Sequence, residues 1–122
     1  MDVLSDRSLR ATKNGLDLLI RLPWYRTLPL STVEIKQVSI DGRPIDADKI
    51  SLGINGKNFK LNQLAELTAE FWFVLDSAIL HIENPGAKSG AEYDVEVVVV
   101  LYPPYIPAIS FPNLGKSRLR AA

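Results

Sequence analysis

The chain has 122 residues, 47% hydrophobic and 23% charged, which is typical of one soluble domain large enough to bury a core. Fourteen basic residues balance fourteen acidic ones, so the formal net charge of +0 gives no basic field to attract nucleic acid or anionic lipid. The first residues lack a signal region, and the longest apolar run, Val97 to Leu101, is too short to span a bilayer, which predicts a cytoplasmic protein.

Alternation of apolar and polar residues predicts the first strands. Leu16, Leu18 and Ile20 are two apart in a strand over residues 16–22. A second strand is predicted over residues 33–40, where the apolar phase changes near Gln37. We expect a β-bulge or a strand buried on both faces at that point.

The segment LPWYRTLPL, residues 22–30, sets two aromatic residues and an arginine between two prolines. Proline fixes its own φ, lacks an N–H donor and favours an extended preceding residue, so we expect a stiff connector. Trp, Tyr and Arg are enriched in binding hot spots. The segment therefore predicts a partner surface made by Pro23, Trp24, Tyr25, Arg26, Leu28 and Pro29. The alternative is that Trp24, Tyr25 and Arg26 close the end of the domain's own core, with Arg26 paired to a carboxylate.

Turn residues divide the middle of the chain. Asp41-Gly42 predicts a tight turn, and Asn55-Gly56 predicts a hairpin because both positions tolerate positive φ. The hairpin joins predicted strands around residues 50–54 and 59–61. We expect a short helix capped by Asn62 to follow and to run through Glu70.

The run FWFVL, residues 71–75, is prone to β structure. Strand geometry would place Phe71, Phe73 and Leu75 on one face, toward the core, and Trp72 on the other, where it is a candidate for the partner surface. Further strands are predicted over residues 78–83 and 93–101, with a surface loop over 84–90 between them. The second half of the last strand is apolar on both faces, so we expect it to be buried on both, by the domain or by a partner.

From Tyr102 onward the sequence shows no strand or helix period, which predicts an extended arm. A disordered tail would be poor in aromatic and β-branched residues, whereas this segment carries apolar residues as far as Leu114. We expect the arm to dock on a partner through Tyr102, Pro103, Pro104, Tyr105, Ile106 and Phe111. The basic end, with Lys116, Arg118 and Arg120, is expected to fray.

Together these elements predict an all-β fold. We expect an antiparallel β-sandwich of about seven to eight strands with one short helix and an extended C-terminal arm, and the alternative is a partly closed barrel. The sandwich domain is expected to cover residues 1–107. The arm, partly docked on a partner, is expected to cover residues 108–122.

Residues that could carry chemistry are scarce. The chain has no cysteine and one histidine, His81, whereas zinc and iron sites draw on Cys and His. His81 has no partners in a catalytic pattern and is expected to be a solvated strand residue. Asp46 and Asp48 lack the other ligands of a calcium loop, and no spacing supports an acid pair such as Glu34 with Asp17. We therefore expect no catalytic residue, metal ligand or cofactor in this chain.

Four segments in succession carry a resemblance to a known family: LPWYRTLPLSTVE, IDGRPID, LGINGKNFKLNQLAELTAEFWFVLD and the valine-rich strand that ends in YPPYIP. This succession resembles the small beta subunit of bacterial C-glycoside deglycosidases over residues 16–107. The segments are a structural and interface pattern rather than a catalytic signature.

The resemblance implies a heteromeric lyase that cleaves the C–C glycosidic bond of C-glycosides, such as flavonoid C-glucosides, after a separate oxidoreductase has formed the 3-keto sugar. It implies that an alpha subunit with a TIM-type barrel carries the chemistry and a divalent metal, often manganese. The ketone acidifies the neighbouring C–H, a general base removes that proton, and the metal stabilises the enolate. The number of αβ units stays open.

Two functions from different classes remain. The first is a non-catalytic subunit that holds the alpha barrel through the proline segment and the C-terminal arm. The second is a stand-alone carbohydrate-binding β-sandwich that stacks sugar on Trp24, Tyr25 or Trp72, which would need exposed, coplanar rings.

Overall fold

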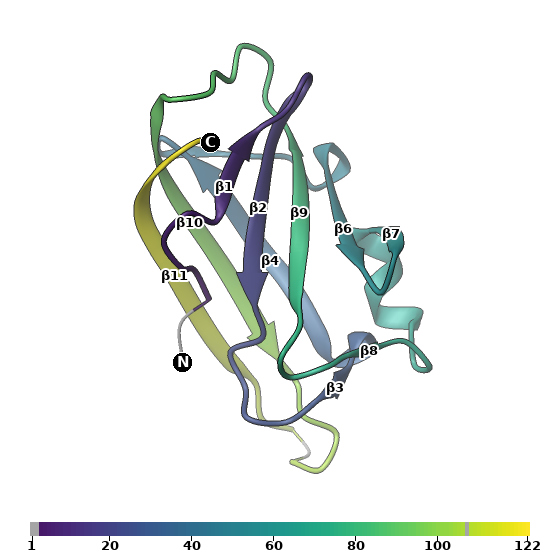
Figure 1. Cartoon of the computed structure of the whole chain (residues 1–122). Coiled ribbons are helices and arrows are strands. Elements are labelled where there is room, and N and C mark those ends of the chain that lie inside the picture. Colours follow the sequence, from purple (N-terminus) through teal and green to yellow (C-terminus); the bar gives the residue numbers. More distant parts are fainter. Residues whose placement is uncertain (1–2, 107) are drawn as a thin grey trace.

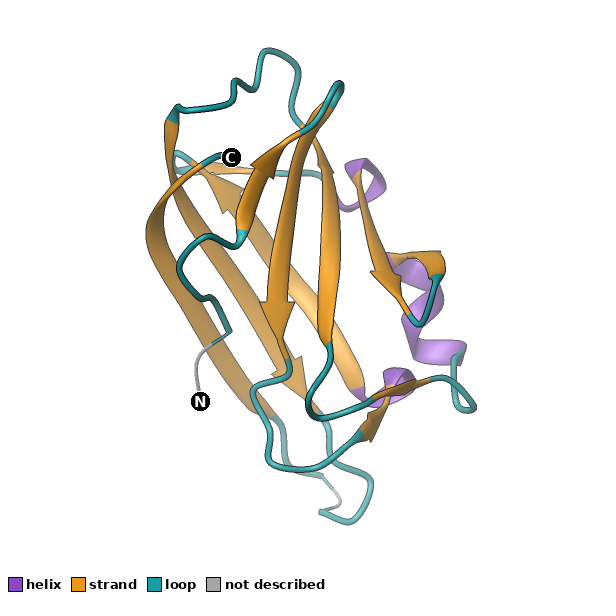
Figure 2. Ribbon diagram, in the orientation of Figure 1, coloured by secondary structure: helices purple, strands orange, loops and turns teal. Residues whose placement is uncertain are grey.

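The computed structural model describes residues 3–106 and 108–122, and these residues form an all-β fold, as predicted. The predicted domain boundary at Pro107 lies outside the described residues. Three short 3-10 helices accompany the strands among the described residues (Figure 2), and none of them is long or apolar enough to cross a membrane. The strands are β1 (Leu9–Ala11), β2 (Gly15–Arg21), β3 (Leu28–Pro29), β4 (Val33–Ile40), β5 (Arg43–Pro44), β6 (Ile50–Ile54), β7 (Lys57–Lys60), β8 (Phe71–Trp72), β9 (Ser77–Glu83), β10 (Glu92–Leu101) and β11 (Phe111–Arg120), and the helices are η1 (Leu30–Thr32), η2 (Ala47–Lys49) and η3 (Leu61–Glu66).

Two antiparallel sheets face each other in a sandwich (Figure 1). One sheet has the strand order β1-β2-β9-β6-β7, and the other has the order β11-β10-β4-β5. A third, two-stranded sheet of β3 and β8 lies at one end. The predicted strand over residues 16–22 is confirmed as β2, whose Leu16, Leu18 and Ile20 are fully buried, while Leu19 points outward.

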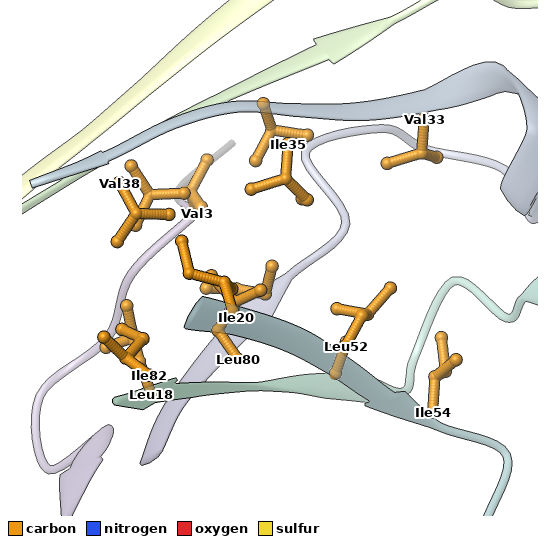
Figure 3. Packing of buried hydrophobic residues seen from close by; sticks show 14 of the residues in the cluster. Val3, Leu18, Ile20, Val33, Ile35, Val38, Leu52, Ile54, Leu80 and Ile82 are labelled. Carbon is orange, nitrogen blue, oxygen red and sulfur yellow. The ribbon is translucent and has the colours of Figure 1, made fainter. Parts of the chain in front are cut away.

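The core lies between the two sheets. Figure 3 shows Val33, Ile35 and Val38 of β4 facing Ile20, Leu52 and Leu80 of the other sheet. Each of these side chains is at most 7% exposed. Burying a Val, Leu or Ile side chain contributes about 1.5–3 kcal/mol, so this layer is the main source of stability.

The predicted irregularity near Gln37 is a β-bulge. Val98 of β10 pairs with Gln37, and the next residue, Val99, pairs with Ile35, which leaves Lys36 as the extra residue of β4. A bulge reverses the face on which later residues lie. Both Ile35 and Val38 therefore reach the core, although they are three residues apart.

The predicted hairpin at Asn55-Gly56 is also confirmed. Asn55 and Gly56 have φ values of 54° and 73°, and they join β6 to β7. Positive φ at both central residues is the condition for a turn that matches the twist of the strands. Asp41 and Gly42 adopt the same conformation between β4 and β5, with φ values of 52° and 77°.

The expected C-terminal arm is wrong for residues 111–120, because this segment is strand β11. It pairs with β10 over ten residues, from Leu101↔Phe111 to Glu92↔Arg120. The basic residues that were expected to fray alternate along β11, and Arg118 contacts Glu92 at 2.9 Å and Asp94 at 3.1 Å. The acidic residues of β10 complement the basic residues of β11. This charge pattern was present in the sequence, but it was not used when the segment was predicted to be an arm.

Residues beyond β11 connect the two sheets. The backbone N–H of Ala122 donates to the carbonyl of Leu9, and the N–H of Ala11 donates to the carbonyl of Ala122, at 3.0 and 3.1 Å. The sandwich is thus closed along its β1–β11 side, which is a feature of the partly closed barrel considered as the alternative.

The helix expected from Asn62 to Glu70 is shorter and of another type. The 3-10 helix η3 covers Leu61–Glu66, and its N-cap is Lys60, not Asn62. The Gln63 side chain accepts a hydrogen bond from the backbone N–H of Lys60 at 2.8 Å. Only Leu64 of this helix is buried, and a helix with so narrow an apolar face gains little by extending.

The expected core face at residues 71–75 is also wrong. Only Phe71–Trp72 is strand, and Trp72 is the buried residue, while Phe73 and Leu75 are 51% and 94% exposed. The chain turns directly after Trp72, where the N–H of Asp76 donates to the carbonyl of Phe73 at 2.9 Å. The strand alternation therefore does not continue past β8.

Candidate interaction surface

Three loops meet at one end of the sandwich, beside the small β3–β8 sheet (Figure 1). They are residues 22–27 after β2, residues 73–76 before β9, and the described residues 102–106 and 108–110 between β10 and β11. Strand register places them together. Arg21 at the end of β2 pairs with Ser77 at the start of β9, and Leu101 at the end of β10 pairs with Phe111 and Val33 at the starts of β11 and β4. The segments beyond these strand ends therefore lie at the same end of the sandwich. We call this region the aromatic end.

Trp24 joins two of these loops. Its Nε1 donates a hydrogen bond to the hydroxyl oxygen of Tyr105 at 2.5 Å, and its ring centroid lies 5.0 Å from that of Phe111. Trp24 is half-buried against the edge of the core. This packing is what the alternative interpretation expected of Trp24, and its use at a partner surface stays a prediction.

Arg26 lies close to the rings of two tyrosines. Its Cζ lies 5.4 Å from the ring centroid of Tyr25 and 5.6 Å from that of Tyr105. Both rings are about half exposed, at 56% and 47%. Hydrogen bonding to Tyr105 raises the pKa of Tyr25 from its ordinary value. The expected pairing of Arg26 with a carboxylate is not found among the described residues.

A second apolar group lies on the β8 side of the aromatic end. The Thr27 hydroxyl accepts a hydrogen bond from the backbone N–H of Val74 at 3.0 Å, which links loop 22–27 to loop 73–76. Beside this contact, Phe71 and Phe73 lie 6.5 Å apart between ring centroids, and Leu75 extends into solvent. Sequence reasoning missed this group, because it assigned these side chains to the core.

Apolar exposure is concentrated at this end. Large contiguous apolar patches on a folded domain mark binding surfaces, whereas single exposed residues do not. Leu19 and Leu114, which lie on strands, are the exceptions among the exposed large hydrophobic residues of the described chain. The other eight belong to β8 or to the loops of the aromatic end: Tyr25, Phe71, Phe73, Val74, Leu75, Tyr102, Tyr105 and Ile109.

The residues predicted for a partner surface divide by burial. Trp72 is 0% exposed, and its Nε1 donates to the carbonyl of Asp76 at 2.8 Å, so it cannot present its side chain to a partner. Leu28, Pro23 and Pro103 are also buried, while Trp24, Pro29, Ile106 and Phe111 are half-buried. The exposed members are Tyr25, Arg26, Tyr102, Pro104 and Tyr105.

Stacking of a sugar would need rings in one plane. Trp24 and Tyr25 are tilted by 33° to each other, and Trp72 is inside the core. The three aromatic residues suggested for a carbohydrate-binding module therefore do not form a common platform.

His81 lies elsewhere, on the outer face of the five-stranded sheet. Its Nδ1 is 2.7 Å from Oδ1 of Asp17, and Arg10 contacts the other oxygen of Asp17 at 3.3 Å. A Cβ on Gly53 would lie 2.9 Å from Nε2 of His81, so the glycine leaves room for the ring. His81 was expected to be solvated, but it is half-buried and paired. An open hollow of about 530 Å³, whose lining includes Asp17, Lys60 and His81, lies beside it.

Other acidic candidates are not assembled into a site. Asp17 is on β2, whereas Glu34 is on β4 of the opposite sheet and accepts a hydrogen bond from the Tyr102 hydroxyl at 2.8 Å. This bond raises the pKa of Tyr102. Within residues 3–106 and 108–122, no three His, Asp or Glu side chains are grouped so that they could hold a metal ion.

Comparison with known proteins agrees with the resemblance. Residues 2–105 match the family described as C-glycoside deglycosidase beta subunit. The 3'-dehydrocarminate deglycosidase beta subunit of Microbacterium sp is 34% identical over 110 residues, which cover 90% of this chain and 83% of that protein. The C-glycoside deglycosidase beta subunit of Microbacterium trichothecenolyticum is 34% identical over 85% of this chain and 79% of its own length. One from Arthrobacter globiformis is 37% identical over 71% of this chain and 66% of its own length. The chain therefore belongs to the family of C-glycoside deglycosidase beta subunits.

Proposed function

We propose that this chain is the non-catalytic subunit of a heteromeric lyase that cleaves the C–C glycosidic bond of 3-oxo-C-glycosides, such as oxidised flavonoid C-glucosides. The chemistry is assigned to an alpha subunit with a TIM-type barrel and a divalent metal. Manganese is the metal to test first. The two chains assemble as one or more αβ units in the cytoplasm. Membership of the beta subunit family supports the subunit role.

The name of one relative supports an oxidised sugar as the substrate. The Microbacterium protein is named for 3'-dehydrocarminate, a compound oxidised at the 3' position. A ketone at this position acidifies the adjacent C–H, so a general base can remove the proton and the aglycone carbon can leave with a proton from an acid. These acid and base groups are placed in the alpha subunit. The present chain has one histidine and no cysteine, and its histidine is paired with Asp17 on an outer sheet face.

The aromatic end is the observation that carries the proposal. Among the described residues, eight exposed large hydrophobic side chains lie on β8 or in the loops of this end, which come from segments far apart in the sequence. The Trp24–Tyr105 hydrogen bond joins two of these loops. Aromatic residues and arginine are enriched at interface centres, and permanent complexes bury of order 2,000 Å² or more in total. We assign this end as the surface that binds the alpha subunit. The beta subunit would stabilise and orient the barrel from there.

The test is co-expression with the alpha subunit encoded in the same genome. Size-exclusion chromatography with light scattering should show one αβ species, and a 3-keto-C-glycoside should be cleaved only by the mixture. Leu75→Glu should prevent co-elution, since it introduces a charge at a residue that is 94% exposed in the free chain. The control is Leu19→Glu on the five-stranded sheet, which should co-elute like the wild type. A free monomer that elutes apart from the alpha subunit would contradict the proposal.

A further inference from the structure

Arg26 lies next to two tyrosine rings that are connected to the sheet. A series of contacts runs from Phe111 to Trp24 through ring packing, from Trp24 to Tyr105 through the 2.5 Å hydrogen bond, and from Tyr105 to Arg26 through a cation–π contact. Tyr25 covers the guanidinium within 5.4 Å. Because Phe111 starts strand β11, the series fixes an exposed loop residue to the sheet.

The charge of Arg26 is not neutralised by the described chain. Arg10, Arg118 and Arg120 each contact a carboxylate within 3.4 Å, whereas Arg21 of β2 and Arg43 of β5 have no ion pair among the described residues. Within residues 3–106 and 108–122 no carboxylate pairs with Arg26, and its side chain is exposed. The N–H edges of a guanidinium form a planar fork that matches a carboxylate with two parallel hydrogen bonds, and contacts with aromatic rings do not use that fork.

Arg26 also lies within an apolar surface. Tyr25 and Tyr105 flank it directly, and the next residue, Thr27, leads to the Phe73 and Leu75 group through its contact with Val74. An apolar rim excludes water from a central polar contact and makes that contact stronger. A cation that is oriented before binding also loses less side-chain entropy on binding.

We infer that Arg26 is the polar anchor of the interface and that it binds an Asp or Glu carboxylate of the alpha subunit through both edge N–H groups. This rests on the proposed function, because it takes the alpha subunit as the occupant of the aromatic end. The choice of a carboxylate follows from charge complementarity to a guanidinium that is not neutralised by the described residues.

The test measures the dissociation constant of the αβ complex by titration calorimetry for the wild type, Arg26→Ala and Arg26→Lys. Loss of one partner from a desolvated charge pair should weaken binding by about 30-fold or more in Arg26→Ala. Arg26→Lys keeps the charge but loses the planar fork, and it should weaken binding by about tenfold. Unfolding midpoints should stay at the wild-type value, because the side chain is exposed.

The matched control is Arg43→Ala. Arg43 is also exposed and unpaired among the described residues, but it lies at the opposite end of the sandwich, next to Ile40 of β4. This variant should bind the alpha subunit like the wild type. The carboxylate is then found by combining Arg26→Ala with single Asp→Asn and Glu→Gln changes on the alpha subunit. A substitution of the carboxylate that binds Arg26 should weaken the complex of the wild-type beta subunit but should not weaken the complex of Arg26→Ala further.

The outcomes separate the inference from the proposed function. If the wild type binds the alpha subunit and Arg26→Ala binds equally well, the inference is wrong and the proposed function stands. If Arg26→Lys binds as tightly as the wild type, the planar fork is not used and the inference is also wrong. If the wild type does not bind the alpha subunit, the proposed function fails and the inference fails with it.

Discussion

The indole Nε1 of Trp24 and the hydroxyl of Tyr105 form a 2.5 Å hydrogen bond between residues that are 81 positions apart. This bond connects the loop after β2 with the connection from β10 to β11, so it links the two sheets at the aromatic end. The ring of Trp24 supports the edge of the core, while Tyr105 presents its own ring to solvent. One contact thus ties the stability of the fold to the shape of the proposed interface.

Trp24→Ala should weaken the αβ complex by about 30-fold or more, the range of a hot-spot residue that organises its neighbours. Trp24→Phe keeps a ring against Phe111 but removes the N–H donor to Tyr105, so its effect should be smaller. Calorimetric titration against the alpha subunit measures both. The control is Leu114→Ala, a 62% exposed residue in the middle of β11, which should leave the affinity unchanged. Full affinity in Trp24→Ala would exclude Trp24 from the interface.

Local sequence patterns were sufficient where the structure depends on near neighbours. The alternation of Leu16, Leu18 and Ile20 predicted β2, because alternation follows from the pleat of a strand. Asn55-Gly56 predicted the turn between β6 and β7, because that turn needs positive φ at both residues. The change of apolar phase near Gln37 predicted a bulge or a strand buried on both faces, and the structure has the bulge. These parts of the fold needed no knowledge of the partner strand.

Features that depend on distant residues were missed. Strand β11 contains Pro112 and Gly115 and has little apolar alternation, and its pairing depends on β10, where Glu92 and Asp94 face Arg118. The residue types at positions 24–26, which are Trp, Tyr and Arg, were enough to predict a partner surface at this segment. The contact with Tyr105 was not, because proximity over 81 residues is set by strand register.

Trp72→Ala should destabilise the fold rather than the interface. Trp72 is fully buried and donates its N–H to the carbonyl of Asp76, so truncation leaves a cavity and an unpaired carbonyl. Loss of a buried Trp costs about 3–5 kcal/mol of unfolding free energy. The adjacent Phe73 is 51% exposed, so Phe73→Ala should change the unfolding free energy by no more than about 0.5 kcal/mol. Urea denaturation of the free chain separates the two, and equal losses would mean that Phe73 is part of the core.

Gly115→Ala should destabilise the packing of β11. Gly115 is buried, and a Cβ there would lie 2.9 Å from Cβ of Val3 and 3.0 Å from Cγ of Leu4. Residues 3 and 4 would have to move away from the strand. Overpacking of this kind costs about 1–3 kcal/mol of unfolding free energy. Ser117→Ala, two residues along on the same face, adds no atoms and is the control. A stability equal to the wild type for Gly115→Ala would show that residues 3 and 4 adapt freely.

Acid should weaken the β10–β11 pairing through Glu92. Hydrogen bonds from Arg118 and Arg120 lower the pKa of Glu92 below its ordinary value of 4.5. A carboxylate whose pKa is lower in the folded state than in the unfolded state adds stability that is fully present above pH 4.5 and is lost as the pH falls through the folded pKa.

Urea midpoints measured from neutral pH to below pH 4.5 should therefore fall less steeply for Glu92→Gln than for the wild type. High salt should reduce the difference, because the pair is exposed and screened. Glu66→Gln is the control, since Glu66 is exposed in η3 and has no ion pair among the described residues. If Glu92→Gln and the wild type lose stability in parallel, the ion pairs of β11 do not hold it on the sheet, and its backbone pairing with β10 alone is sufficient.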